Sequence, residues 1–89
     1  MEHIIDAEFK ELCKEIVEEN NSLEEWAEIE SDDMFQSKNY FGGFYADEME
    51  FGFTYYDKDD NKYWFKVSLD IIEKILDGEI TRVSIEPYE

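Results

Sequence analysis

The chain has 89 residues, of which 25 are acidic and 8 basic, so its formal net charge at pH 7 is −17. This length allows one domain with one core, residues 1–89, but not two domains, and a hydrophobic content of 43% excludes a disordered tail. The charge excludes direct binding to nucleic acid and to an anionic membrane, because both require a basic face.

The first third of the chain predicts two helices. Apolar residues recur at helical spacing over residues 5–17 and place one apolar arc on an amphipathic helix. This helix should end at Asn20 and Asn21, whose side chains compete for backbone hydrogen bonds. Ser22 and Glu25 then form a capping box for a short second helix over residues 23–30, which should end before Ser31.

The period then changes from 3.6 to 2, and the composition becomes aromatic. Apolar and other residues alternate over residues 49–56 and 63–68, which predicts an antiparallel hairpin with one face packed on the helices. A further strand is expected over residues 39–46, with a bulge or bend at Gly42 and Gly43.

The end of the chain predicts a third helix and a last strand. Ser68 can cap a helix over residues 69–77, and Gly78 stands where a left-handed residue ends such a helix. Residues 79–86 alternate as a strand that closes at Pro87. The predicted order is α-α-β-β-β-α-β, an α+β domain of two layers in which the helices lie mainly on one face of an antiparallel sheet.

Cysteine and histidine are too few for a structural zinc site, which needs four such ligands, because Cys13 and His3 are single. A lone cysteine forms no intramolecular disulfide, and residues 1–6 lack the pattern of a signal peptide, so we expect a cytoplasmic protein. Cys13 lies on the apolar arc of the first helix and should be a buried hydrophobe rather than a nucleophile.

The motifs that could carry chemistry are weak. Asp57, Asp59 and Asn61 match the first ligand positions of a calcium-binding EF-hand loop, but Lys62 stands where that loop needs Gly and Ser68 where it needs Glu. We therefore expect a hairpin turn. Carboxylates are so abundant that no pair of them indicates acid–base catalysis, and we predict no metal, no cofactor and no enzymatic activity.

The acids are unevenly placed. Residues 1–33 hold 13 acids and 2 bases, a net charge of −11, against −6 for residues 34–89. Six acids over the 13 steps from Asp6 to Glu19 give one charge per about 3.3 Å of helix axis, close to the phosphate spacing of about 3.4 Å along one DNA strand. The predicted partner-binding acids are Glu8, Glu11, Glu15, Glu18, Glu19, Glu24, Glu25 and Glu28.

Aromatic side chains suggest a second surface. Tyr56 and Trp64 fall on the side of the hairpin opposite its core stripe, which predicts an aromatic patch of the kind found at interfaces. Alternatively, aromatic residues 40, 41, 44 and 45, or a partner subunit, cover this side of the sheet. Oligomeric state does not follow from the sequence.

Three functions fit these features. The first is a small inhibitor that mimics nucleic acid and binds the basic cleft of a nucleic-acid-binding protein, the general character of phage inhibitors of host defence such as anti-CRISPR and anti-restriction proteins. No motif of a particular family is present. The second is an immunity protein or antitoxin that neutralises a basic toxin. The third is a housekeeping interaction module that uses the aromatic face, with the acids serving solubility alone.

Overall fold

The computed structural model describes residues 1–29 and 34–88. Along the chain, its helices and strands are β1 (Glu2–Ile4), α1 (Ala7–Glu18), α2 (Leu23–Glu28), β2 (Met34–Gln36), β3 (Tyr40–Tyr45), β4 (Glu50–Tyr56), β5 (Lys62–Val67), α3 (Leu69–Leu76), β6 (Arg82–Ser84) and β7 (Glu86–Pro87). The predicted α+β class and its order α-α-β-β-β-α-β are confirmed, with short strands added at β1 and β2 and the last strand divided into β6 and β7.

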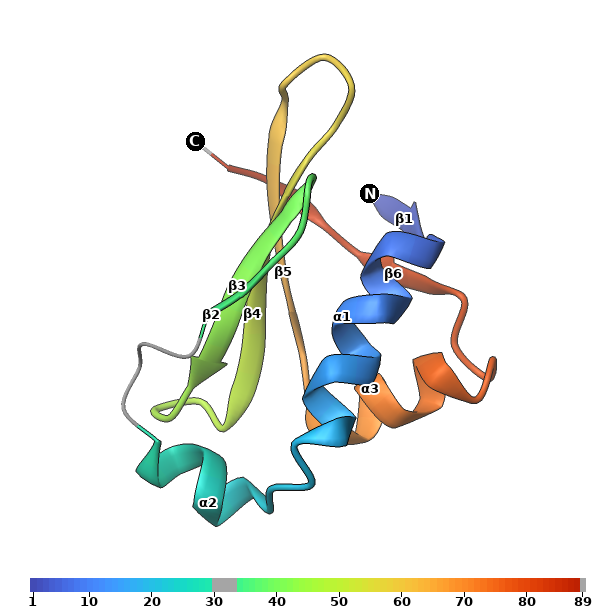
Figure 1. Ribbon diagram of the computed structural model, residues 1–89. Coiled ribbons are helices and arrows are strands. Elements are labelled where there is room, and N and C mark those ends of the chain that lie inside the picture. Colours follow the sequence, from blue (N-terminus) through green and yellow to red (C-terminus); the bar gives the residue numbers. More distant parts are fainter. Residues whose placement is uncertain (30–33, 89) are drawn as a thin grey trace.

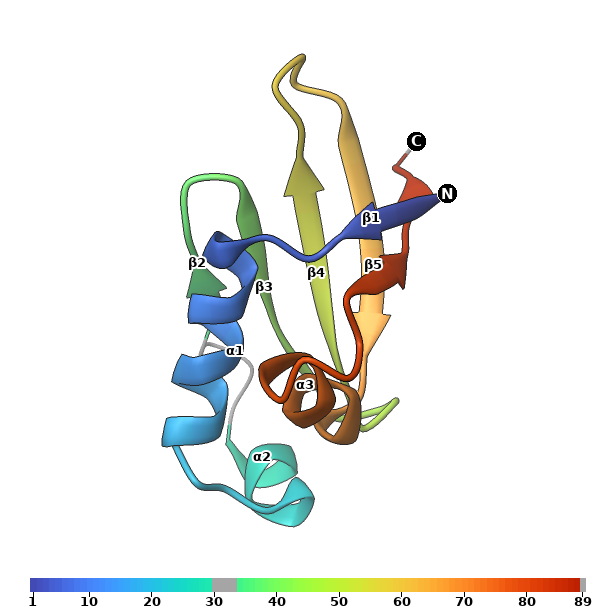
Figure 2. The ribbon, with the colours of Figure 1, turned by 90° about the vertical axis from the view of Figure 1, so that its right-hand side faces the viewer.

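Five strands form one antiparallel sheet in the order β2-β3-β4-β5-β7, and β1 pairs with β6 in a separate antiparallel pair. Helices α1 and α3 lie side by side on one face of the five-stranded sheet, and α2 lies at its lower end (Figure 1). Seen from the helix side, β1 and β6 cross in front of the sheet (Figure 2). Within residues 1–29 and 34–88, no helix covers the opposite face of the sheet.

Most of the observed helix caps are those that the sequence predicts. Asp6 caps α1 by accepting a hydrogen bond from the Phe9 N–H, and Ser68 caps α3 in the same way. At α2, both halves of the predicted capping box form. Gly78 has a φ of 81°, the left-handed conformation expected of it after α3. Helix α2 ends at Glu28, and Ile29 has an extended backbone, so the predicted continuation of the helix through residue 29 is wrong. Residue 30 and the predicted break at 31–33 lie outside the described residues.

The expected bulge at Gly42 and Gly43 is wrong. β3 pairs with β4 without interruption from Tyr40 opposite Tyr55 to Tyr45 opposite Glu50. Gly42 instead permits a close approach, because a Cβ at this position would overlap the carbonyl oxygen of Gly52.

Several short elements depart from the predicted pattern. β1 and β2 have three residues each, too few for an alternation to stand out, and Ile4 and Ile5 resemble the start of the helical stripe. Ile5 precedes the Asp6 cap, so α1 begins at Ala7 rather than at residue 5. The tail alternates over residues 79–86 and so predicts one strand that closes at Pro87, which is wrong in two respects. β6 begins only at Arg82 and pairs with β1, whereas β7 includes Pro87 and pairs with β5.

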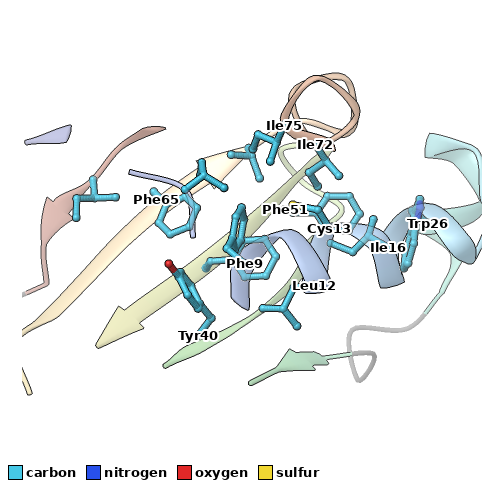
Figure 3. Close-up of a cluster of buried hydrophobic side chains, with 14 residues drawn as sticks. Phe9, Leu12, Cys13, Ile16, Trp26, Tyr40, Phe51, Phe65, Ile72 and Ile75 are labelled. Carbon is cyan, nitrogen blue, oxygen red and sulfur yellow. The ribbon is translucent and has the colours of Figure 1, made fainter. Parts of the chain in front are cut away.

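The core lies between the helices and the covered face of the sheet (Figure 3). Phe9 of α1 is its centre, with ring centroids 5.1 Å from Tyr40, 5.0 Å from Phe53 and 5.3 Å from Phe65. Trp26 brings α2 onto the same core, with its ring 5.2 Å from that of Phe51. Since these side chains come from α1, α2, β3, β4 and β5, their packing fixes where the helices sit on the sheet.

Candidate binding surfaces

Helix α1 separates an apolar side from an acidic one. Phe9, Leu12, Cys13 and Ile16 are buried, and helical geometry turns the intervening acids away from the core. Together with α2 these acids form what we call the acidic surface, whose members are all exposed: Glu11, Glu15, Glu18, Glu19, Glu24, Glu25 and Glu28.

The charges of the acidic surface are not neutralised by ion pairs. In the described parts of the chain, the ion pairs are Lys66–Glu48, Lys74–Asp70 and Arg82–Glu2, all outside α1 and α2. Seven carboxylates, six on the two helices and one on Glu19 at the C-cap of α1, therefore face solvent with their charge uncompensated by a paired cation. Such a surface attracts a basic partner from a distance.

Glu8 was predicted to belong to this surface, but its contacts differ. Its carboxylate accepts hydrogen bonds from the Ser37 hydroxyl, from the Asn39 backbone N–H at 2.6 Å and from the Asn39 side-chain amide at 2.9 Å. Burial alone would raise the pKa of Glu8, but these hydrogen bonds outweigh it and lower the pKa below its ordinary value. Glu8 thus ties α1 to the connection between β2 and β3.

Glu25 has a partial structural role as well. One of its carboxylate oxygens accepts a hydrogen bond from the Ser22 backbone N–H at 3.1 Å, while the Ser22 hydroxyl accepts one from the Glu25 N–H at 3.2 Å. The side chain stays exposed and charged. Replacing Glu25 would therefore disturb the start of α2 together with any contact to a partner.

The second predicted surface is the side of the sheet that α1 and α3 leave uncovered. We call it the open face. Trp64 stands opposite Thr54 in the register of β4 and β5, and Tyr56 stands opposite Lys62, so Tyr56 and Trp64 do lie on this one face. Tyr56 is 39% exposed and Trp64 is half-buried.

The open face holds more aromatic residues than the hairpin alone predicts. Phe41 and Tyr45 of β3 point to it, as their pairing with Thr54 and Glu50 requires, and Tyr88 joins them beyond β7. Of the aromatic residues that were suggested as a cover, Tyr40 and Phe44 pack on the core instead. The alternation of residues 41, 43 and 45 could have identified the β3 contribution, whereas Tyr88 follows Pro87 and carries no strand signal.

A groove of about 490 Å³ runs across the open face. Tyr45, Trp64 and Tyr88 form its apolar lining, and Glu48 and Lys66 contribute charged groups. Its floor includes Gly52, over which the Tyr45 ring lies so closely that a Cβ on this glycine would overlap it. The absence of a side chain at residue 52 therefore lets the Tyr45 ring lie directly against β4.

Two lysines of the open face have partners within the chain. The Lys62 ammonium lies 3.9 Å from the centre of the Tyr88 ring, a cation–π contact. Lys66 donates a hydrogen bond of 2.6 Å to Glu48, which raises the pKa of Lys66. Both lysines are held in place on the surface rather than extending freely from it.

The remaining reactive groups have structural explanations. Cys13 is fully buried as predicted, and burial raises the pKa of its thiol to about 12. His3 Nε2 lies 2.6 Å from the Tyr40 hydroxyl, which donates a hydrogen bond of 3.0 Å to Asp6. This chain of contacts fastens β1 to the start of α1 and to the sheet.

The predicted hairpin turn is confirmed at residues 57–61. Asp57 accepts hydrogen bonds of 2.9 Å from the backbone N–H groups of Asp59 and Asn61, so its carboxylate builds the turn.

Among the described residues, no group of three or more His, Cys, Asp or Glu side chains is arranged to hold a metal ion. Within the same residues, no helix has both the length and the apolar character needed to cross a bilayer.

Comparisons with protein-family models, with curated proteins and with solved structures find no match to this chain.

Proposed function

We propose that this protein is a non-enzymatic acidic inhibitor that binds the basic, nucleic-acid-binding surface of a target protein. The observation that carries the proposal is the acidic surface, which has seven exposed carboxylates on α1, its C-cap and α2. None of them belongs to the ion pairs of the described residues. A basic cleft that normally holds phosphates is the complementary surface.

The charge spacing supports mimicry of nucleic acid after the engaged acids are removed from the count. Asp6 caps α1 and Glu8 binds Ser37 and Asn39, so neither is free for a partner. The four acids from Glu11 to Glu19 extend over eight steps of about 1.5 Å, which gives one charge per about 3 Å of axis. One DNA strand has a phosphate per about 3.4 Å. The charge density along the helix axis over residues 11–19 is therefore still close to that of DNA.

The net charge of −17 determines how such a complex would form. Strong opposite charges increase the rate of encounter, and the increase diminishes with salt as the Debye length falls from about 10 Å at 0.1 M to about 3 Å at 1 M. Binding through the acidic surface should therefore be fast and salt-sensitive. In this proposal the protein acts in the cytoplasm, where an unpaired cysteine is ordinary.

Two biological roles would use this same electrostatic contact. An anti-defence inhibitor of the anti-CRISPR or anti-restriction type would block a host enzyme that binds DNA or RNA, whereas an immunity protein or antitoxin would neutralise a basic toxin. Gene position separates them, because an immunity gene lies beside its toxin gene and a defence inhibitor lies in a phage or mobile element.

The test is a tagged pull-down from nuclease-treated cell lysate, washed in parallel at low and high salt, with identification of the retained proteins by mass spectrometry. We expect a nucleic-acid-binding enzyme that is retained at low salt and lost at high salt, and that loses activity when this protein is added. A variant with Glu11→Lys, Glu15→Lys and Glu18→Lys should fail to retain this enzyme, because positive charges replace the carboxylates of the contact. The variant should still fold, because the core side of α1 is unchanged.

The matched control reverses the same number of charges elsewhere. Glu73, Asp77 and Glu79 are exposed on α3 and the turn after it, so changing all three to Lys alters the net charge equally without touching the acidic surface. Asp57 is unsuitable as a control because its carboxylate builds the hairpin turn. Unchanged retention by the α1 variant, or equal loss in both variants, would refute the acidic surface as the contact.

A further inference from the structure

The open face differs from the rest of the molecule in its charge. The open face and its rim hold three lysines and four acids, which are Lys38, Lys62, Lys66, Asp47, Glu48, Glu50 and Glu86. The local charge is thus −1 in a chain whose net charge is −17, and three of its eight basic residues are gathered at this face. A strongly basic partner would gain little from electrostatic attraction there.

The aromatic residues of the open face have large exposed fractions. Tyr45 is 53% exposed, Tyr88 50%, and Phe41 and Tyr56 39% each. With Trp64 they surround the groove and the adjoining surface of β3 and β4. Large aromatic side chains with low local charge are the composition of an interface core.

The α1 part of the acidic surface lies on the other side of the sheet, and α2 lies at the lower end of the sheet (Figures 1 and 2). If two copies packed open face to open face, two sheets about 10 Å apart would separate their helix layers, which themselves lie about 10 Å beyond each sheet. The acids of α1 in the two copies would then be about 30 Å apart, several times the Debye length of about 8 Å at physiological salt.

The size of the face sets the strength of such a contact. The central strands have six or seven residues, which is about 20 Å at 3.3 Å per residue, and five strands spaced by about 4.8 Å span about 20 Å. Two copies would bury about 800 to 1,000 Å² together, close to the lower limit for a specific interface. The expected contact is therefore weak and depends on concentration.

From these observations we propose that the open face is the contact between two copies of this chain. In an isologous dimer a two-fold axis in the plane of the contact lets the lysines of one copy approach the glutamates of the other, and the aromatic rings pack between them. The result is a four-layer particle, helix–sheet–sheet–helix, with the acids of α1 on each outer side. This proposal does not depend on what the acidic surface binds.

Sedimentation velocity over a range of concentrations tests it. We expect the mass to rise from 10.7 kDa toward twice that value, with more dimer at moderate salt because screening reduces the repulsion between two acidic chains. Acrylamide quenching gives an independent readout without mutation. Trp26 is 2% exposed in the monomer already, so a decrease in quenching on concentration reports burial of Trp64.

A charge placed in the contact should separate the copies. Tyr45→Glu together with Tyr56→Glu should weaken association by about 30-fold or more, and both side chains are exposed enough for the fold to tolerate the change. The control is Val17→Glu with Leu76→Glu, which adds the same charges at exposed apolar positions of α1 and α3 and should leave association unchanged. Circular dichroism and thermal unfolding verify that both variants fold.

A monomer at every concentration up to about 1 mM, or a dimer that persists in the Tyr45/Tyr56 variant, would overturn the proposal. If the chain is monomeric and the same variant loses a protein captured from lysate, the open face belongs to that other protein and the second-copy assignment is wrong. The pull-down of the α1 variant is a separate outcome, because its three substitutions lie on the other side of the sheet.

Discussion

The two faces of the five-stranded sheet are built from alternate residues of the same strands, yet they differ in nearly every physical property. Phe65 points to the helices and is 3% exposed, whereas its neighbour Trp64 points to the open face and stays half-buried. The covered face is apolar and closed by α1 and α3, and the open face mixes aromatic rings with balanced charges. The comparison shows that hydrophobic residues in this chain serve two purposes, folding on one side and contact on the other.

Truncating adjacent residues of β5 is the strongest test of that distinction. Phe65→Ala should destabilise the protein by about 3 to 5 kcal/mol, because its ring packs against Phe9 and Phe53. Trp64→Ala should cost less than about 1.5 kcal/mol in dilute monomer, since a half-buried ring loses less contact. Urea unfolding followed by circular dichroism measures both, and similar costs would mean that the two faces are equally covered.

The two glycines at the centre of β3 and β4 provide a second test. Gly42→Ala should cost about 1 to 3 kcal/mol, because its Cβ would overlap the backbone of the neighbouring strand. Gly52→Ala meets only the ring of Tyr45, which can turn away into solvent, so we expect less than about 1 kcal/mol. The same unfolding assay applies, and a larger cost for Gly52→Ala would show that Tyr45 is fixed in place.

The acids of α1 allow a test of the helix layer itself. Glu8→Gln should destabilise by about 1 to 2 kcal/mol, because it weakens hydrogen bonds from Ser37 and Asn39. Glu11→Gln should be neutral or stabilise by about 0.2 to 0.5 kcal/mol, since it removes repulsion from nearby acids. Thermal unfolding distinguishes them, and equal effects would place Glu8 among the free acids.

The contribution of Glu8 should depend on pH in a definite direction. Because its folded pKa lies below the ordinary 4.5, the contribution is present at neutral pH and is lost as the pH falls below about 4.5. The difference in stability between the natural protein and Glu8→Gln should therefore shrink in acid. A difference that stays constant down to about pH 3 would contradict this explanation.

A smaller effect is expected from His3. Burial lowers the pKa of His3 below its ordinary 6.5, and the charge of Asp6 offsets part of this shift. The unfolded chain then binds the proton more tightly, so stability decreases as the pH falls through about 6.5. His3→Gln should remove this component, by less than about 1 kcal/mol between about pH 7.5 and 5.5. Parallel pH profiles for the two proteins would show that His3 does not titrate in this way.

Much of the fold was predictable because local and long-range signals coincide. Ser22, Ser68 and Gly78 mark helix ends in the sequence and occupy those positions in the structure. β1 and β2 were not predictable, because three-residue strands depend on partners elsewhere in the chain, such as Val83 opposite His3.

The candidate surfaces were predictable in part for a similar reason. Helical periodicity places Glu11, Glu15 and Glu18 on one side of α1, and strand alternation places Tyr56 with Trp64. Periodicity cannot show that Glu8 is engaged, because its partners lie 29 and 31 residues away. Nor does it place Tyr88 on the open face, where β7 brings it by pairing with β5.

The buried thiol of Cys13 has a practical consequence. With a pKa of about 12, very little of it is thiolate at neutral pH, and the fully buried sulfur is out of reach of a disulfide reagent. Labelling must therefore proceed through an opening of the structure that exposes α1. The labelling rate, divided by the rate for the unfolded chain, gives the equilibrium constant of that opening when reclosing is fast. As the chain's single cysteine, Cys13 permits this measurement in the natural protein, without any substitution.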